Sequence, residues 1–288
     1  MIVVRRPEEL EPASRSVAIG TFDGVHRGHR GVRDAARAAH LRPGVVTFEP
    51  HPRAVLGGEV RLLSTTERRV ELLAAAGIED VILLHFDREL AGLAPEEFAE
   101  SVLQVAGAEV VAAGDTFRFG RNRSGDLDLL ERLGFDVRRV PLVDNVSSSH
   151  VRKLIAAGDL AHAAQLLGRP AEVEGTVVTG DRRGKELGFP TANLGVPDDL
   201  LVPPDGVYAG SALGHPAAVS IGTNPHYGGG ERRVETYLLD FEGDLYGKRL
   251  VVELWERLRD QARFESEAEL AAAIADDVEQ TRRAVRPA

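Results

Sequence analysis

The chain has 288 residues, of which 43% are hydrophobic and 28% are charged, as in folded globular proteins, and it is long enough for two domains. It contains no cysteine, which excludes disulfides, thiolate metal sites and cysteine nucleophiles. The sequence has no apolar run near the ~20 residues that a membrane-spanning helix needs. The formal net charge of −10 argues against broad nucleic-acid binding, which requires a basic surface. We therefore expect a cytoplasmic protein that binds neither nucleic acid nor membranes. The net charge does not argue against the binding of small phosphorylated ligands, which need only local hydrogen-bond donors.

The first half of the sequence alternates between short apolar runs and helical patterns. The apolar runs, rich in β-branched residues, predict buried parallel strands at 16–20, 45–48, 81–86 and 109–114. Helices are expected from residue 27 onward, at 64–77 and at 95–107. Ser64 and Glu67 stand in capping-box spacing at the start of the second helix, and Pro95 stands at the start of the third. Strands and helices that alternate without hairpin signals predict a doubly wound, Rossmann-like α/β domain.

After two short helices expected at 150–170, the pattern changes to short strands. The strand-like runs lie at 174–180, 206–213, 217–223, 232–241 and 248–258. Their close spacing, with Gly, Pro and Asp turns between them, predicts a small antiparallel β-barrel. The segment 266–284 has the pattern of a terminal helix capped by Ser266. We place the domain boundary near Gly168, which gives an α/β domain at 1–168 and a barrel domain with its helix at 169–288.

The stretch GTFDGVHRGHR, residues 20–30, follows the first predicted strand and places His26 and His29 at the start of a helix. The free backbone N–H groups and the dipole of a helix start favour an anion, so both imidazoles are placed to donate to phosphate oxygens. A zinc site completed by Glu49 or His51 is an alternative, although metal-binding pairs on helices more often have i, i+4 spacing. The third interpretation is a pair of solvent-facing histidines.

A second anion-binding pattern is SSSHVRKL, residues 147–154. Ser147 and Ser148 precede a helix, and Arg152 lies on its first turn, where a guanidinium can hold phosphate oxygens in a fork. Serine runs also cap helices without binding any ligand. Combined with the early histidine pair, the pattern favours an adenylyl-transfer site. One motif would hold the α-phosphate and the other the departing pyrophosphate.

These motifs carry a family resemblance. GTFDGVHRGHR, VVTFEPHP, GDTFRFGRNRSGD and VSSSHVR, in this order, resemble the FMN adenylyltransferase module of bacterial bifunctional riboflavin kinase/FAD synthetases. That module belongs to the wider HxGH nucleotidyltransferase group. The resemblance continues through EGTVVTGDRRGKELGFPTANL, PPDGVYAG and VETYLLDFEGDLYG, so it covers nearly the whole chain. GFPTANL is the most specific of the motifs.

The resemblance implies roles for residues of the first half. His26 and His29 match the histidines that stabilise the α-phosphate during adenylyl transfer. The other matching positions imply an ATP site at Gly20, Phe22, Asp23, Ser147, Ser148 and Arg152, and a flavin site at Gly114, Thr116, Phe117, Phe119 and Gly120. The phosphate of FMN is itself the nucleophile, so the reaction needs alignment and charge stabilisation rather than a covalent enzyme intermediate.

In the second half the resemblance implies a kinase site. The glycine-rich TGDRRGKELG, with Gly180 and Gly184, can wrap its backbone around phosphates. Thr191 and Asn193 of PTAN offer oxygen ligands to Mg²⁺ bound with ATP. Glu235 matches the general base that accepts the proton of the riboflavin 5′-hydroxyl. Taken without the resemblance, PTAN also fits a simple turn, and Glu235 fits a solvated strand residue.

Two positions depart from the family pattern. Thr116 stands before the first Phe of the flavin loop, where the family typically has Asn or Asp, and a hydroxyl lacks the two hydrogen-bonding ends of an amide. His226 and Tyr227 stand where the family usually has Thr and Phe. The first departure predicts a weaker or differently placed flavin in the adenylyltransferase half.

The leading hypothesis is therefore a two-site transferase that phosphorylates riboflavin to FMN and then adenylylates FMN to FAD. It would use ATP and Mg²⁺, with riboflavin, FMN and FAD as substrates or products, as a monomer or weak homo-oligomer. One alternative keeps only the kinase activity. A second alternative is a non-catalytic flavin or nucleotide sensor, which would be expected to lose Glu235 or the magnesium ligands. A tRNA-binding role fits the acidic chain poorly.

Overall fold

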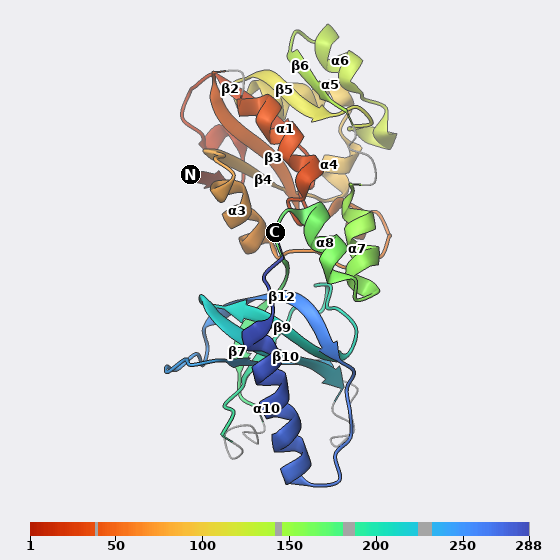
Figure 1. Ribbon diagram of the computed structural model, residues 1–288. Coiled ribbons are helices and arrows are strands. Elements are labelled where there is room, and N and C mark those ends of the chain that lie inside the picture. The colour runs from red at the N-terminus through yellow and green to blue at the C-terminus, as the bar shows by residue number, and fades with distance from the viewer. Residues whose placement is uncertain (38–39, 142–145, 181–187, 224–231, 288) are drawn as a thin grey trace. The chain divides into compact units, whose positions relative to one another are not determined.

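The computed structural model describes residues 1–37, 40–141, 146–180, 188–223 and 232–287. The chain forms two compact units (Figure 1). Unit 1 comprises Met1–Val60 and Thr66–Ser147, and unit 2 comprises Arg61–Thr65 and Ser148–Ala288.

Unit 1 contains a six-stranded parallel sheet with the order β1-β4-β3-β2-β5-β6. Its strands are β1 (Ile2–Val4), β2 (Arg15–Ile19), β3 (Arg42–Glu49), β4 (Asp80–His85), β5 (Ala108–Gly114) and β6 (Asp136–Val140). The four predicted strands are confirmed as β2 to β5. The two edge strands β1 and β6 have no counterpart among the predicted runs. The observed topology confirms the doubly wound α/β domain.

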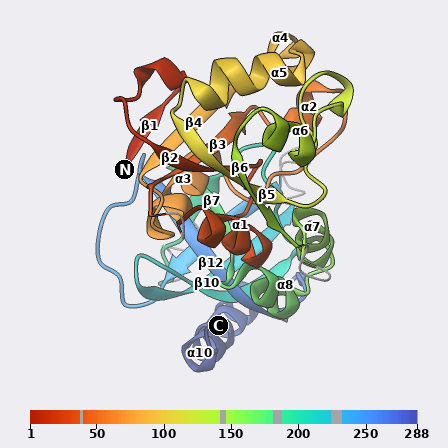
Figure 2. The same ribbon diagram turned by 90° about the horizontal axis from the view of Figure 1, so that it is seen from above.

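Successive residues of the central strands enter cores on opposite faces of the sheet. Val17 and Ile19 of β2 pack in one core and Ala18 in the other, as the alternation of side chains along a strand requires. Helices α1 (Arg27–Arg37) and α3 (Thr66–Ala75) cover the face of Ala18, and α5 (Pro95–Phe98) covers the other (Figure 2). Both faces of the sheet are therefore buried, which explains why its central strands are continuously apolar.

The helix predicted at 95–107 begins at Pro95 as α5 (Pro95–Phe98) and continues as a π-helix, η2 (Ala99–Gln104). Gly107, with φ +69°, ends it in the left-handed conformation. The remaining short helices of unit 1 are η1 (Pro7–Glu9), α2 (Pro52–Val55), α4 (Arg88–Gly92), η3 (Arg121–Arg123) and α6 (Leu127–Arg132). Helix α3 begins at Thr66, slightly later than the predicted cap at Ser64 implies.

The amino ends of the sheet strands are joined by a buried arginine. Arg15, the first residue of β2, is 2% exposed, and its Nε donates to Asp80 Oδ2 at 2.7 Å. Its Nη1 also donates to the carbonyl of Ala106, at 2.9 Å. A buried charge needs such pairing. The Arg15 guanidinium therefore fixes the end of the sheet opposite to the edge where ligands bind in open α/β folds.

Unit 2 begins with helices α7 (Ser148–Ala156) and α8 (Leu160–Leu167), separated at Gly158, which confirms the two predicted helices. A closed antiparallel barrel follows, with the order β10-β11-β8-β7-β12-β9. Its strands are β7 (Ala171–Val178), β8 (Ala192–Gly195), β9 (Gly206–Ala212), β10 (His215–Thr223), β11 (Arg232–Leu238) and β12 (Arg249–Arg259). The predicted barrel is confirmed, and the PTAN segment enters strand β8.

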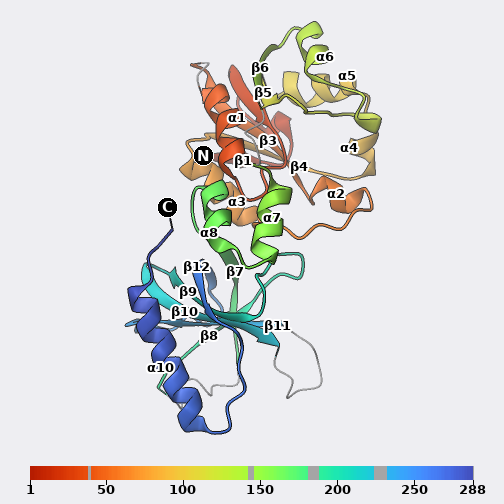
Figure 3. The same cartoon turned by 45° about the vertical axis from the view of Figure 1, so that its right-hand side comes forward.

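Helix α10 (Glu267–Arg283) lies along the outside of the barrel (Figure 3). Ser266 caps it as predicted, because its hydroxyl accepts the backbone N–H of Glu269 at 3.2 Å. Val278 and Ile274 pack against Ala218 of β10 and Leu239. One apolar stripe thus attaches the helix to the barrel.

Helices α7 and α8 belong to unit 2 because their apolar faces enter the core of the barrel. Val151, Ile155 and Leu160 pack in one cluster with Val173 and Val252. The boundary predicted near Gly168 follows these helices, whereas the compact units divide before them, at Ser148. The functional boundary of the first domain stays a prediction.

Candidate functional site

The turn between β2 and α1 carries the first candidate site. Phe22 and Val25 adopt φ values of +49° and +39°. This left-handed backbone conformation is rare for residues other than glycine. The backbone N–H of Val25 donates to the carbonyl of Phe22 at 3.0 Å and closes the turn. Asp23 is 1% exposed and Phe22 is fully buried. Strain of this kind is commonly found at functional sites.

The two histidines that follow this turn stack on each other. The ring centroids of His26 and His29 are 3.7 Å apart with an interplanar angle of 16°, and the ring of Phe22 lies 5.0 Å from that of His29. His26 is buried and His29 is half-buried, so neither is the solvent-facing histidine of the third interpretation. Burial lowers the pKa of His29 well below 6.5, and the charge of His26 lowers it further. A neutral His29 can still donate one N–H to a phosphate oxygen.

Gly28, between the histidines, is required by their stacking. A Cβ at Gly28 would lie 3.1 Å from Cε1 and 3.2 Å from Nδ1 of His26. A Cβ at this position would therefore require the His26 ring to shift. The glycine of the HxGH motif thus preserves the placement of the pair.

The zinc interpretation depends on Glu49 and His51, which are engaged elsewhere. Nδ1 of His51 accepts the backbone N–H of Arg53 at 3.1 Å and caps α2. Burial works to raise the pKa of Glu49, but hydrogen bonds from Thr66 and Arg5 hold it below its ordinary value. Within the described ranges, no three His, Asp or Glu side chains gather in a way that could hold a metal ion.

The serine-rich motif lies at the division between the units. Ser147 is the last residue of unit 1, while Ser148 and Arg152 belong to α7 in unit 2. Nε of Arg152 donates to the carbonyl of Arg61 at 2.6 Å, and its side chain is half-exposed. Ser147 therefore shares unit 1 with the histidine pair, whereas Ser148 and Arg152 belong to the other unit. Their joint action on ATP stays a prediction.

The predicted flavin loop follows β5, whose last residue is Gly114. Phe119 is 8% exposed and packs on Phe98 at 5.6 Å between ring centroids, so it is a core residue. Phe117 is half-buried and stacks on Phe119 at 5.7 Å, while Thr116 is exposed. Gly120 has a φ of +68°, and a Cβ there would lie 2.8 Å from the backbone of Pro95. Phe117 is thus the more exposed of the two rings, and the flavin role of this loop stays a prediction.

In unit 2, the PTAN segment lines a cavity of about 570 Å³ at the barrel surface. Thr191, Asn193 and Gly180 line this cavity together with Phe241 and Tyr246. A Cβ at Gly180 would lie 2.1 Å from Nδ2 of Asn193, so only glycine leaves room for that amide. The structure therefore brings the predicted Gly180, Thr191 and Asn193 together around one cavity.

Glu235 is on strand β11, of which Thr236 and Leu238 line this cavity. In the antiparallel register it is paired with Asn193 on β8 and with Ser220 on β10. Directly opposed residues have Cβ atoms about 4.5–5.5 Å apart and share a face. All three side chains are half-buried, whereas Val234 and Thr236 on either side of Glu235 are buried in the barrel. The predicted Gly184, His226 and Tyr227 lie outside the described residues.

Comparison with known proteins finds one matching family model for each part of the chain. A family model described as FAD synthetase matches residues 8–152, and one described as riboflavin kinase matches residues 167–285. A protein from Escherichia coli (strain K12) named bifunctional riboflavin kinase/FMN adenylyltransferase is 37% identical over 281 residues, which cover 91% of this chain and 90% of that protein. The chain belongs to this family.

One further relative and one solved structure also match this chain over nearly their whole length. The bifunctional riboflavin kinase/FMN adenylyltransferase of Pseudomonas fluorescens is 36% identical and covers 100% of this chain and 99% of its own length. A crystal structure titled macrolide-efflux protein, from Streptococcus pneumoniae, is 31% identical with a TM-score of 0.86 over 98% of both chains. Within the described residues, no helix has both the length and the apolar character to span a bilayer.

One buried residue next to the histidine turn was missed by the sequence analysis. Arg69 on α3 is 5% exposed and donates to the carbonyls of Thr21 and Phe48, at the ends of β2 and β3. Arg68 directly precedes it in the sequence. No local pattern shows which of the two arginines is buried.

Proposed function

We propose that the chain makes FMN from riboflavin in unit 2 and FAD from FMN by the HxGH site of unit 1, each with its own ATP. Both activities are those of the family to which it belongs. The direct register pairing of Glu235 with Asn193, which lines one cavity together with Thr191 and Gly180, is the observation that supports the kinase assignment most strongly. The cytoplasmic location and the monomeric or weakly oligomeric state stay predictions.

In the kinase reaction, the 5′-oxygen of riboflavin forms a bond to the γ-phosphorus of ATP, and the bond from that phosphorus to the β-phosphate oxygen breaks. Glu235 accepts the hydroxyl proton, and ADP leaves. Gly180 keeps the space in which the amide of Asn193 faces the phosphates. Most of the catalysis is positioning and charge stabilisation, because phosphoryl transfer needs little covalent chemistry from the protein.

Thr191 and Asn193 would hold Mg²⁺. Their uncharged oxygens suit a hard cation that also takes phosphate oxygens as ligands, and both residues line the same cavity. The ion would neutralise charge on the ATP phosphates when bound. The protein residues themselves orient the phosphates and accept the proton.

In the adenylyl transfer, an oxygen of the FMN phosphate forms a bond to the α-phosphorus of ATP, and pyrophosphate leaves with the α–β bridging oxygen. The stacked pair His26 and His29 donates to the α-phosphate oxygens, where negative charge develops. Gly20, Phe22 and Asp23 form the turn that carries them. We assign the triphosphate to Ser147, Ser148 and Arg152, and the flavin ring to the loop with Phe117.

The test is a product time course with riboflavin, ATP and Mg²⁺, the flavins being separated by chromatography. The wild type is expected to form FMN and then FAD. Glu235→Gln keeps the shape of the side chain and removes the base, so phosphorylation should fall by about 10²–10⁴-fold, while added FMN still becomes FAD. His29→Ala removes one donor and should slow FAD formation by about 10²–10³-fold, so FMN accumulates.

Two other results would overturn the assignment. A wild type that stops at FMN would leave only the kinase, and Thr116 in the flavin loop would be the first residue to examine. A wild type that forms neither product would favour the non-catalytic sensor.

A further inference from the structure

Arg69 joins the carboxyl ends of two sheet strands next to the histidine pair. Its Nη1 donates to the carbonyl of Thr21 at 3.0 Å, and its Nη2 donates to the carbonyl of Phe48 at 3.0 Å. Thr21 comes two residues after β2, and Phe48 lies in the last part of β3. A single buried guanidinium therefore ties together the two strand ends that border the HxGH turn.

The carbonyl that Arg69 holds precedes the strained part of this turn. Phe22, with φ +49°, is the next residue after Thr21, and Val25, with φ +39°, directly precedes His26. The hydroxyl of Thr47 donates to the same Thr21 carbonyl at 3.0 Å. Left-handed conformations of non-glycine residues persist only where the surroundings fix them. Arg69 and Thr47 supply such fixation at the start of the turn.

Arg69 is a buried charge beside this turn. Burial lowers its pKa, and the carboxylates of Asp23 and Glu49 oppose that effect. Its Nε is buried and, among the described residues, has no hydrogen-bond acceptor. Removing this cation would leave the carbonyls of Thr21 and Phe48 without its donors. The hydrogen bonds of Arg69 are thus tied to the conformation of the turn that carries the histidines.

We propose that Arg69 is a positioning residue for adenylyl transfer, which holds the left-handed turn so that His26 and His29 meet the α-phosphate. This inference rests on the proposed function of unit 1. Arg69 acts through the Thr21 carbonyl and the turn, and it does not touch the reacting atoms. Misplacement of catalytic groups by about 1 Å lowers rates on the order of 10²-fold.

The test compares Arg69→Met and Arg69→Lys with Arg15→Met in the full-length chain. Arg15 is also a buried arginine that bonds carbonyls of the same sheet, but it lies at the amino ends of the strands. Arg15→Met should therefore destabilise unit 1 without moving the turn. If Arg15→Met does not fold, Arg42→Met replaces it, because Arg42 pairs with the same Asp80 and is more exposed.

The first readout is conversion of added FMN and ATP to FAD, measured well below the thermal transition of each variant. Arg69→Met should lower kcat on the order of 10²-fold, with KM for both substrates nearly unchanged. Arg69→Lys, which keeps the charge but not the two-carbonyl geometry, should recover part of the rate. Arg15→Met should keep the wild-type kcat. Equal loss in the Arg69 and Arg15 variants, or none in Arg69→Met, would overturn the proposal.

The second readout needs no activity. Histidine-ring NMR follows the titration of His29, whose pKa is held down by burial against Phe22 and His26. Relaxation of the turn in Arg69→Met should raise this pKa toward 6.5, while Arg15→Met should leave it in place. An unchanged titration in Arg69→Met would contradict the positioning role. If the wild type makes no FAD, the proposed function fails, and the titration alone then decides the role of Arg69.

Discussion

Glu235 on β11 and Asn193 on β8 are directly opposed in the antiparallel register of the barrel. The amide of Asn193 occupies the space left by the missing Cβ of Gly180. The base and the phosphate-facing amide of the proposed kinase site are thus held by adjacent, rigid strands. Sites on strands hold their geometry better than sites on loops.

We expect Gly180→Ala to impair the kinase activity selectively. The new Cβ would lie 2.1 Å from Nδ2 and 2.4 Å from Cγ of Asn193, so the amide must move. A displacement of this size should lower kcat/KM for riboflavin phosphorylation on the order of 10²-fold, while FAD formation from added FMN is unchanged. A double-mutant cycle with Asn193→Ala is the control. If the two effects are additive, Gly180 does not act through Asn193.

Gly28→Ala should impair the other activity. Its Cβ would meet the ring of His26 at 3.1 Å and separate the stacked histidines, so FAD formation should fall about 10-fold or more. Riboflavin phosphorylation should continue at the wild-type rate. Gly92→Ala is the matched control, because a Cβ at that helical position has nothing within 4 Å. A Gly28→Ala variant with full adenylyltransferase activity would refute the steric role of this glycine.

The stability of unit 1 should fall in acid because of His29. Its native pKa lies well below 6.5, so below about pH 6.5 the unfolded chain binds a proton that the native state does not. This contribution to the free energy of unfolding is fully present above that pH. It is lost at up to about 1.4 kcal/mol per pH unit as the pH falls toward the native pKa.

Urea unfolding of the wild type and of His29→Gln between about pH 5 and pH 8 measures this effect. The variant should show the shallower dependence on pH. His85→Gln, which removes an exposed histidine from β4 of the same sheet, is the comparison. Parallel curves for the wild type and His29→Gln would show that His29 is not linked to folding.

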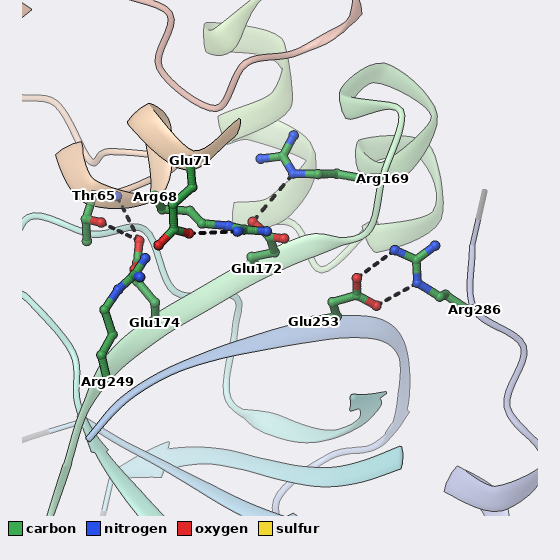
Figure 4. Close-up of polar contacts among 9 residues, drawn as sticks. All are labelled: Thr65, Arg68, Glu71, Arg169, Glu172, Glu174, Arg249, Glu253 and Arg286. Carbon is green, nitrogen blue, oxygen red and sulfur yellow. Dashed lines mark hydrogen bonds and ion pairs between the residues drawn. The ribbon is translucent and has the colours of Figure 1, made fainter. Parts of the chain in front are cut away.

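Two ion pairs of the barrel, Glu174 with Arg249 and Glu253 with Arg286, should differ in their contribution to the free energy of unfolding (Figure 4). Glu174 is 3% exposed, accepts from Nε of Arg249 at 2.8 Å and from Nη2 at 2.5 Å, and also accepts the backbone N–H of Thr65 at 3.1 Å. Glu174→Ala leaves Arg249 without this partner and should lower the free energy of unfolding by about 3–5 kcal/mol.

Glu253 pairs with Arg286, which is 52% exposed, at 2.6 Å. Arg286→Ala removes this exposed pair and should change the free energy of unfolding by less than about 1 kcal/mol. Thermal and denaturant unfolding of both variants checks the contrast. A Glu174→Ala variant as stable as Arg286→Ala would show that burial does not strengthen the Glu174 network.

The sequence determined the features that depend on local signals. The apolar runs located β2 to β5, the hydroxyl of Ser266 located the start of α10, and Pro95 located that of α5. The motifs identified the histidine pair and the PTAN segment, because these residues are contiguous. Strand β6 was missed since its residues Asp136–Val140 are largely exposed and charged, and an edge strand needs no apolar run.

The tertiary structure alone decided which side chains of a local pattern are buried. Phe119 is in the core and Phe117 is not, although both belong to one short motif. Arg68 and Arg69 are adjacent and chemically identical, but successive helix residues point about 100° apart. Arg68 therefore pairs with Glu71 on its own helix, while Arg69 reaches the strand ends beside His26. Only the packing of α3 on the sheet distinguishes them, because burial is a property of the fold and not of the residue.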